Sequence, residues 1–306
     1  MTAATPTIPP PSQAHEQTVA APSPFVALMY HNVYPDGRPY TDLSPSATSY
    51  FIPRSTFAAH LSELSAVGGS CMTWGDVTSF YTGSPRPTRP AERFPVLLTF
   101  DDGWRDSVEV AGPLLEQHRC SAVLFVTLDF LGRRHFLSRA DVSRIGTVAL
   151  RVGSHARTHR MLSLLPEDEI RAELADSKKA LEDLAGYEVD SLSIPSGAVD
   201  RRVRRIAAEC GYRFVFDSEV RVNSPGDSAL AIGRVAVMSG TALPVFRRYV
   251  HRRIGREKLR RTVLTAPKRV LGLPRYERLR RRLLGEKPGQ RVTHASATAH
   301  DPSEAE

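Results

Sequence analysis

The stretch Val96-Leu97-Leu98-Thr99-Phe100-Asp101-Asp102-Gly103 determines the fold class of this chain. Its first five residues are apolar or β-branched and lie between Pro95 and Gly103, which predicts a short buried strand. Successive side chains of a strand point to opposite faces, so Asp101 and Asp102 cannot do the same work. The stretch therefore predicts a strand whose end presents two carboxylates in different surroundings.

A second segment, Gly153-Ser154-His155-Ala156-Arg157-Thr158-His159, follows another strand-like run at residues 148–154. Its histidines are four residues apart, so a helix or a turn would place both imidazoles on one side. Two histidines and one carboxylate make a three-ligand metal site with an open position, as hydrolytic metals require. A turn would explain Asp-Asp-Gly alone, and an exposed helix face would explain the histidines alone. Their joint occurrence after two strands favours a metal-dependent hydrolase.

These motifs resemble those of the polysaccharide deacetylases with a NodB-homology domain, over residues 25–240. Residues 99–103 are similar to the first motif of that family, residues 155–159 to the second, and residues 192–197 to the third. The run Ala27-Leu28-Met29-Tyr30-His31-Asn32-Val33 resembles the opening strand of the circularly permuted poly-N-acetylglucosamine deacetylase branch. The resemblance implies an α/β fold, an incomplete (β/α)7 barrel whose site lies at the carboxyl ends of its strands.

The resemblance also implies roles for individual residues. Asp102, His155 and His159 would hold one divalent metal, with zinc expected and cobalt or nickel as alternatives. Asp101 would take a proton from the attacking water, and His31 would protonate the departing amine.

Further residues are expected to support this site or the substrate. Gly103 would allow a sharp turn, and Trp104 would be either a wall for a sugar ring or part of the core. Arg234 would be either a tether for Asp101 or a solvated charge, and Asp217 would be a partner of His31. The third motif adds Pro195 and Gly197.

The chain also departs from the family pattern at three positions. Ala156 replaces the usual Ser or Thr, Arg160 replaces a common Pro, and Ser193 stands where many members carry an arginine. Loss of a polar group beside a metal ligand weakens metal binding tenfold or more when it is introduced by mutation. All proposed metal ligands, the base and the acid are nevertheless present, which favours an active enzyme.

Helical patterns alternate with the strand-like runs. Apolar residues at 57, 61 and 64 precede Gly68, residues 166–184 precede Gly186, and residues 199–210 precede Gly211. Such alternation predicts parallel strands covered by helices.

The chain is expected to have four parts. Residues 1–24 form a disordered Pro/Ala-rich segment, 25–250 the deacetylase-like domain, 251–285 a basic amphipathic helical appendage and 286–306 a disordered tail. No signal peptide or membrane-spanning run is recognisable. Cys71, Cys120 and Cys210 have no metal-site spacing and are expected to be reduced, buried thiols. These observations predict a cytoplasmic protein, peripheral at the inner membrane.

The positive charge of the chain is concentrated near its C-terminus. Residues 247–291 carry 17 Lys and Arg and 3 Asp and Glu, a net charge of +14, which leaves −6 for the rest of a chain whose total is +8. Apolar residues recur within this basic segment, at positions 259, 263, 264, 279, 283 and 284. An anionic membrane surface is the predicted partner of residues 252–284. A helix packed on the barrel is the alternative, and nucleic acid is disfavoured because no recognition motif accompanies the charge.

Together these features predict a metal-dependent hydrolase that removes N-acetyl groups from an N-acetylated sugar or polysaccharide intermediate, in exopolysaccharide or cell-envelope glycan synthesis. Two alternatives stay open. One is another amide or imide hydrolase on the same scaffold. The other is a non-catalytic, glycan-binding relative.

Overall fold

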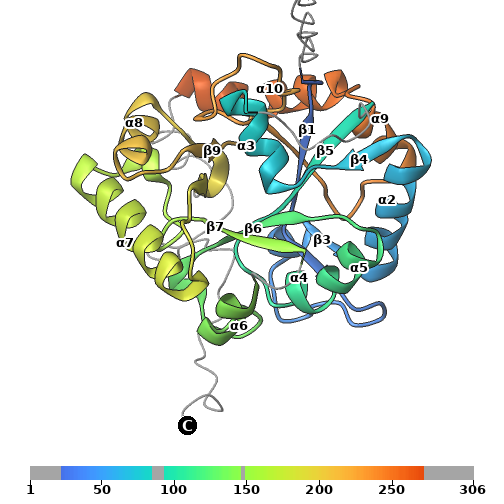
Figure 1. Ribbon diagram of the computed structural model, residues 1–306, viewed down its shortest axis with the longest axis horizontal. Coiled ribbons are helices and arrows are strands. Elements are labelled where there is room, and N and C mark those ends of the chain that lie inside the picture. The colour runs from blue at the N-terminus through green and yellow to red at the C-terminus, as the bar shows by residue number, and fades with distance from the viewer. Residues whose placement is uncertain (1–21, 85–92, 146–148, 272–306) are drawn as a thin grey trace, which may run out of the picture.

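A curved sheet of parallel strands forms the centre of the computed structural model, which describes residues 22–84, 93–145 and 149–271 (Figure 1). The order along the sheet is β10 (Arg234–Ala236), β1 (Val26–Tyr30), β5 (Phe94–Phe100), β6 (Ala122–Val126), β7 (Leu150–Ser154), β8 (Ser191–Ser193) and β9 (Phe214–Phe216). β4 (Gly69–Cys71) also pairs with β5, near the start of that strand. A parallel bridge from Phe216 to Ile232 links β9 to the segment that leads into β10, so the sheet nearly closes on itself. The predicted incomplete (β/α)7 barrel is confirmed.

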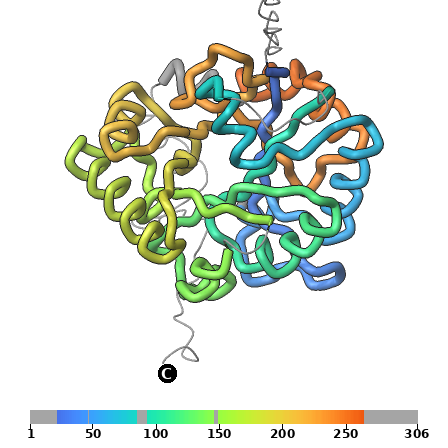
Figure 2. The backbone as a smooth tube through the Cα atoms, in the orientation of Figure 1, coloured from blue at the N-terminus to red at the C-terminus, as the bar shows by residue number. Residues whose placement is uncertain are grey.

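Helices surround this sheet, and the chain returns at its end to lie beside its first strand (Figure 2). The three predicted helices are present as α2 (Arg54–Ala66), α7 (Glu167–Ala185) and α8 (Arg201–Glu209). Gly186 ends α7 with a φ of 74°, the left-handed conformation that a glycine adopts at little cost. The other helices are α1 (Pro45–Thr48), α3 (Trp74–Thr82), α4 (Asp106–Glu109), α5 (Ala111–Gln117), α6 (Arg139–Arg144), α9 (Leu243–Val250) and α10 (Gly255–Leu271).

The register of β1 and β5 brings the opening segment to the site. Tyr30 pairs with Phe100, and the backbone N–H of Asp101 donates to the carbonyl oxygen of Tyr30 at 3.0 Å. The expected opening strand is in fact divided into β1 and β2 (Asn32–Tyr34), and β2 pairs with β3 (Phe51–Pro53) in a separate small sheet. His31 is the residue between β1 and β2, so it follows its strand as Asp101 follows β5.

The expectation that all three cysteines are reduced thiols is wrong. Cys71 and Cys120 form a disulfide across 49 residues of sequence, whereas Cys210 is a free thiol. Cys71 ends β4 and Cys120 precedes β6, and both of these strands pair with β5. The spacing of the cysteines along the sequence did not indicate this disulfide. The two cysteines meet because the sheet places β4 and β6 on either side of β5.

We expect reduction of this disulfide to lower the free energy of unfolding by about 2–4 kcal/mol, because the cross-link restricts the unfolded chain over a long loop. The Cys71→Ser/Cys120→Ser variant should lose the same amount, as measured by urea unfolding. Cys210→Ser, which removes the free thiol, serves as the control and should leave the sensitivity to dithiothreitol unchanged. Equal stability of the oxidised and reduced protein would contradict the prediction.

The basic appendage is described as far as α10. Leu259 and Val263 on this helix are 67% and 62% exposed, so these two members of the apolar stripe do not pack on the barrel. The side chain at 264 and all of residues 272–306 lie outside the described part, as do residues 1–21. Among the helices that the structure describes, none is long and apolar enough to cross a membrane.

Candidate metal and catalytic site

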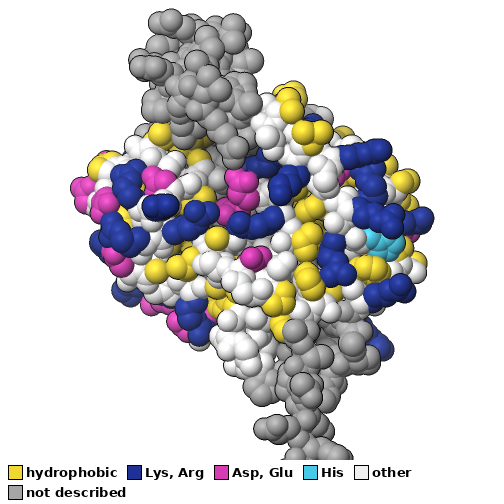
Figure 3. All heavy atoms as spheres, turned by 90° about the horizontal axis from the view of Figure 1, so that it is seen from above, with side chains coloured by type: hydrophobic (Ala, Val, Ile, Leu, Met, Phe, Trp, Pro, Cys, Tyr) yellow, Lys and Arg dark blue, Asp and Glu magenta, His cyan; other side chains and the backbone are white. Residues whose placement is uncertain are grey.

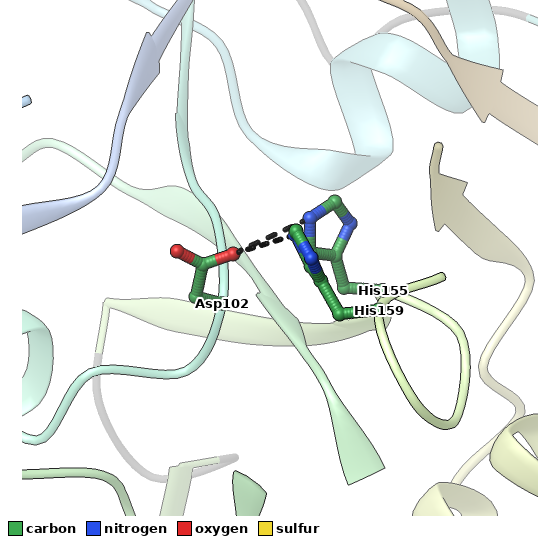
Figure 4. A group of neighbouring side chains, drawn as sticks. All are labelled: Asp102, His155 and His159. Carbon is green, nitrogen blue, oxygen red and sulfur yellow. Dashed lines mark ion pairs between the residues drawn. The ribbon is translucent and has the colours of Figure 1, made fainter. Parts of the chain in front are cut away.

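Asp102, His155 and His159 lie together at the carboxyl ends of β5 and β7 (Figure 4). The Oδ1 atom of Asp102 is 3.4 Å from Nε2 of His155 and 3.3 Å from Nε2 of His159. The segment that carries the histidines is a turn and not a helix, with positive φ values of 60° at Ala156 and 63° at His159. This turn brings both imidazoles to the carboxylate, as the spacing predicted.

The surroundings of these three residues fit a divalent metal. Nδ1 of His155 donates to the backbone carbonyl of Ser193 at 2.8 Å, because a carbonyl can only accept, and this leaves Nε2 with its lone pair. Nε1 of Trp104 donates to Oδ2 of Asp102 at 3.1 Å, which leaves Oδ1 directed at the histidines. Oδ1 is buried and has no hydrogen-bond partner among the described residues. Two imidazole nitrogens and a carboxylate oxygen are suitable ligands for zinc.

The charges around Asp102 favour its ionised form. Burial alone would raise the pKa of Asp102, but the adjacent imidazoles of His155 and His159 outweigh burial and hold this pKa well below its usual value. The carboxylates act on the histidine in the opposite direction, so that Asp101 and Asp102 raise the pKa of His155 against the effect of burial.

Arg234 holds Asp101 through two parallel hydrogen bonds. Nη1 donates to Oδ1 at 2.7 Å and Nη2 donates to Oδ2 at 2.8 Å, and the Arg234 side chain is fully buried. Ser193 joins the pair, since its hydroxyl accepts from Nη2 at 2.8 Å and donates to Oδ2 at 3.3 Å. Burial raises the pKa of Asp101, but Arg234, together with His155 and His31, more than offsets this, and the net shift is downward. The tether alternative for Arg234 is the one that the structure contains, and the solvated-charge alternative is wrong.

His31 follows β1 as Asp101 follows β5, with Tyr30 and Phe100 paired, and its positive form would lower the pKa of Asp101 and of Asp102. Its ring packs on Tyr50 with centroids 4.4 Å apart, and its backbone carbonyl accepts from the Ser107 hydroxyl at 2.8 Å.

Asp217 has other partners than the one expected. Its buried carboxylate accepts from Arg204 at 2.9 Å and from Arg221 at 3.1 Å. The prediction that it pairs with His31 is therefore wrong. Its backbone carbonyl contributes to the site in another way, because it accepts from Nε of Arg234 at 3.2 Å.

Trp104 is part of the core and not a wall of the site, since it is fully buried against Phe51 and Phe136. Its indole N–H nevertheless orients Asp102, a role that the sequence did not indicate. Gly103 has a φ of 89°, in agreement with the predicted sharp turn.

Pro195 and Gly197 form a 3₁₀ turn directly after β8. A side chain at Gly197 would meet the hydroxyl of Ser218 at 2.2 Å, so this turn needs glycine for close packing as well as for its φ of 63°. These two residues shape the backbone beyond Ser193.

Sequence analysis missed Glu173, a buried carboxylate on α7 that contacts the turn between the histidines. The sequence does contain an indication of this role, because Glu173 falls on the buried face of an amphipathic helix. The other buried residues of that face are Ile170, Leu174, Ser177 and Leu181. An acidic residue on the buried face of a helix requires hydrogen-bond partners inside the protein.

Comparison with known proteins shows which family this chain resembles. Residues 88–215 match the model of the polysaccharide deacetylase family. YxkH of Bacillus subtilis, which carries the name of a polysaccharide deacetylase, is 25% identical over 75% of this chain and 77% of its own length. Three further curated relatives are matched over about half of their length or less.

Two solved structures share the fold. IcaB from Ammonifex degensii has a TM-score of 0.62 and 26% identity, over 74% of this chain and 97% of its own. The Streptococcus pyogenes deacetylase PplD, solved in complex with acetate, has a TM-score of 0.64 and 20% identity, over 75% of this chain and 99% of its own. The family resemblance that the motifs predicted is thereby confirmed.

Proposed function

We propose that this chain, whose residues 88–215 match the polysaccharide deacetylase family, removes N-acetyl groups from an N-acetylated carbohydrate with the help of one divalent metal. The observation that carries the metal dependence is the convergence of two imidazole Nε2 atoms on the buried Oδ1 of Asp102. Zinc is the expected metal, and cobalt or nickel would suit the same ligands.

The proposed metal ligands and the residues around them would have different roles in the reaction. A metal held by Asp102, His155 and His159 would polarise the amide carbonyl and lower the pKa of a water molecule. Asp101 accepts the proton of the attacking water, because Arg234 keeps its carboxylate ionised and fixed in orientation. His31 donates a proton to the nitrogen as the C–N bond breaks, so that the sugar leaves as a neutral amine and acetate is the second product.

We expect the full chain, stripped of metal with a chelator, to lose at least about 100-fold in acetate release from N-acetylglucosamine oligomers, and to regain it with one equivalent of zinc or cobalt. Acetate and bound metal are measured on the same samples. Metal binding without release of acetate from oligomers or from a panel of other amides would exclude the proposed reaction. A chain that binds no metal would exclude the proposed site.

The disulfide bears on where the enzyme works. Disulfides persist in oxidising compartments and are rare in cytosolic proteins. The bond between Cys71 and Cys120 therefore counts against the cytoplasmic placement expected from the sequence. We propose that the domain acts in an oxidising compartment, where cell-envelope and extracellular glycans lie.

We further propose that α10 attaches the enzyme to an anionic membrane surface. Leu259 and Val263 lie one turn apart and are exposed, and exposed cations at 256, 258 and 260 flank them. Lys and Arg side chains are numerous on the face of the molecule seen in Figure 3. Each cation close to an anionic membrane contributes about 1 kcal/mol, and the two apolar side chains can enter the headgroup region.

A cavity near this helix supports the proposal that this side of the molecule faces the membrane. It has a volume of about 810 Å³ and is lined by three arginines, at 93, 247 and 253, and by His251. Its one acidic residue, Glu63, is already paired with Arg247. The cavity lies where β5 begins, at the end of the barrel opposite to Asp101, so an attached enzyme would direct its site away from the membrane.

We expect the chain to co-sediment with vesicles that contain phosphatidylglycerol and not with vesicles of phosphatidylcholine alone. The Leu259→Asn/Val263→Asn variant should lose about tenfold in affinity, because less apolar area would be buried. Leu164→Asn, which removes an exposed leucine outside the basic helix, is the matched control. Binding that is unaffected by the double substitution and by 0.5 M salt would exclude this attachment.

A further inference from the structure

We propose that Glu173 is the positioning residue that sets the distance between the two candidate ligand histidines. The inference rests on the proposed metal site and extends it to a residue outside the three sequence motifs. Glu173 lies on α7, 14 positions after His159, and is 3% exposed.

The carboxylate of Glu173 binds the middle of the histidine turn. Its Oε2 accepts from the backbone N–H of Arg157 at 3.1 Å and from that of Thr158 at 2.8 Å. Its Oε1 accepts from the Thr158 hydroxyl and from Nε of Arg160 at 3.2 Å. One side chain therefore binds Arg157 and Thr158, which lie between the two histidines, and Arg160, which follows the second.

The turn needs such support because its backbone is strained. Ala156 and His159 both have positive φ values, which cost about 1 kcal/mol or more for residues other than glycine. A conformation of this kind persists only where surrounding contacts impose it. Four donors on one buried carboxylate provide that constraint at the centre of the turn.

The same helix also holds the start of the turn. The Ser177 hydroxyl contacts the Ser154 hydroxyl at 2.9 Å, and Ser154 in turn accepts from the backbone N–H of Ala156 at 3.1 Å. Ser177 lies one turn of α7 beyond Glu173, so both contacts come from one face of one rigid element. α7 therefore fixes the turn relative to β7 and thus relative to Asp102.

The chain offers a matched control in Glu169. This residue lies one turn before Glu173 on α7 and binds Nη1 of Arg160 at 2.7 Å, but its side chain is 44% exposed and makes no hydrogen bond with the described backbone of the turn. Both glutamates share the Arg160 partner, and only Glu173 holds the backbone. A comparison of the two separates positioning of the ligands from a general loss of charge beside Arg160.

The test measures zinc affinity by competition with a chromophoric chelator, and the visible absorption spectrum of the cobalt-loaded chain. Glu173→Gln keeps the shape but has one acceptor oxygen in place of two and brings an NH₂ group toward donors. We expect it to weaken zinc binding 10- to 100-fold and to change the cobalt spectrum. Glu173→Asp should recover part of the affinity, and Glu169→Gln should stay within about threefold of wild type.

Each outcome either supports or overturns the positioning role of Glu173. Wild-type affinity and spectrum in Glu173→Gln would overturn the positioning role and leave the proposed metal site intact, whereas a wild-type chain that binds no zinc would overturn both. A lower melting temperature of the metal-free variant with an unchanged cobalt spectrum would indicate a purely structural role. Should Glu173→Gln fail to fold, Thr158→Val, which removes one donor and keeps the carboxylate, is expected to weaken zinc binding severalfold. An unchanged affinity there would overturn the inference.

Discussion

Asp101→Asn is expected to reduce the turnover number for acetate release by roughly 10²–10⁴-fold, the range typical for loss of a general base. The amide cannot accept the proton of the attacking water, and its NH₂ group would oppose a donor of Arg234 where the carboxylate now accepts two. Zinc binding should persist, because the three ligands are other residues. The measurement is the rate at saturating substrate, with zinc content determined on the same preparation.

Ser193→Ala is the control for this substitution. It removes the 3.3 Å hydrogen bond to Asp101 but leaves the carboxylate and its two bonds to Arg234. We expect a loss of tenfold or less. If Asp101→Asn retained more than a tenth of the wild-type rate, another group would have to act as the base.

Arg234→Met is expected to lower the free energy of unfolding by about 3–5 kcal/mol, because removing one member of a buried ion pair leaves the other charge uncompensated. Arg234 also donates to Thr99, Ser193 and the backbone of Asp217, and these acceptors would lose a partner as well. Urea unfolding at neutral pH measures the loss. A change below about 1 kcal/mol would show that the pair contributes little to the fold.

The same variant should change the pH dependence of the reaction in a defined direction. In the wild-type chain Arg234 helps to hold the pKa of Asp101 below its usual value. The ion pair therefore stabilises the fold fully at any pH above the usual pKa of an aspartate. This stabilisation is lost only as the pH falls through the lower pKa of Asp101 in the folded protein. Without the guanidinium, burial is opposed only by the weaker effects of His155 and His31, so the pKa of Asp101 rises. The acidic limb of the rate profile should therefore move to higher pH. Arg204→Met, which removes one of two arginines bound to the Asp217 carboxylate, should leave this limb in place.

Local patterns were sufficient for much of the fold and for the three candidate metal ligands. The apolar run before Asp101 predicted β5, and apolar residues at helical spacing before Gly68, Gly186 and Gly211 predicted three helices. The two motifs brought their ligands together because each follows a strand of one parallel sheet, and such strands end at the same edge. These inferences succeed because strand and helix periodicity depends on residues that are close in sequence.

The supporting contacts could not be predicted in this way. Arg234 binds Asp101 across 133 residues, and its position at the start of β10 is equally consistent with a solvated charge. The partners of Asp217, the orientation of Asp102 by Trp104 and the exposure of Leu259 likewise depend on how distant elements pack. A charged or aromatic residue has many potential partners, and only the tertiary structure selects one.

The sequence by itself determined the family resemblance, the parallel α/β architecture and the three candidate metal ligands, because short motifs and hydrophobic periods encode them locally. Only the tertiary structure decided that Asp101 is tethered by Arg234, that Glu173 supports the histidine turn and that Cys71 pairs with Cys120. Closure of the barrel determines which residues meet across its strands, and burial determines that the charges among them must find partners.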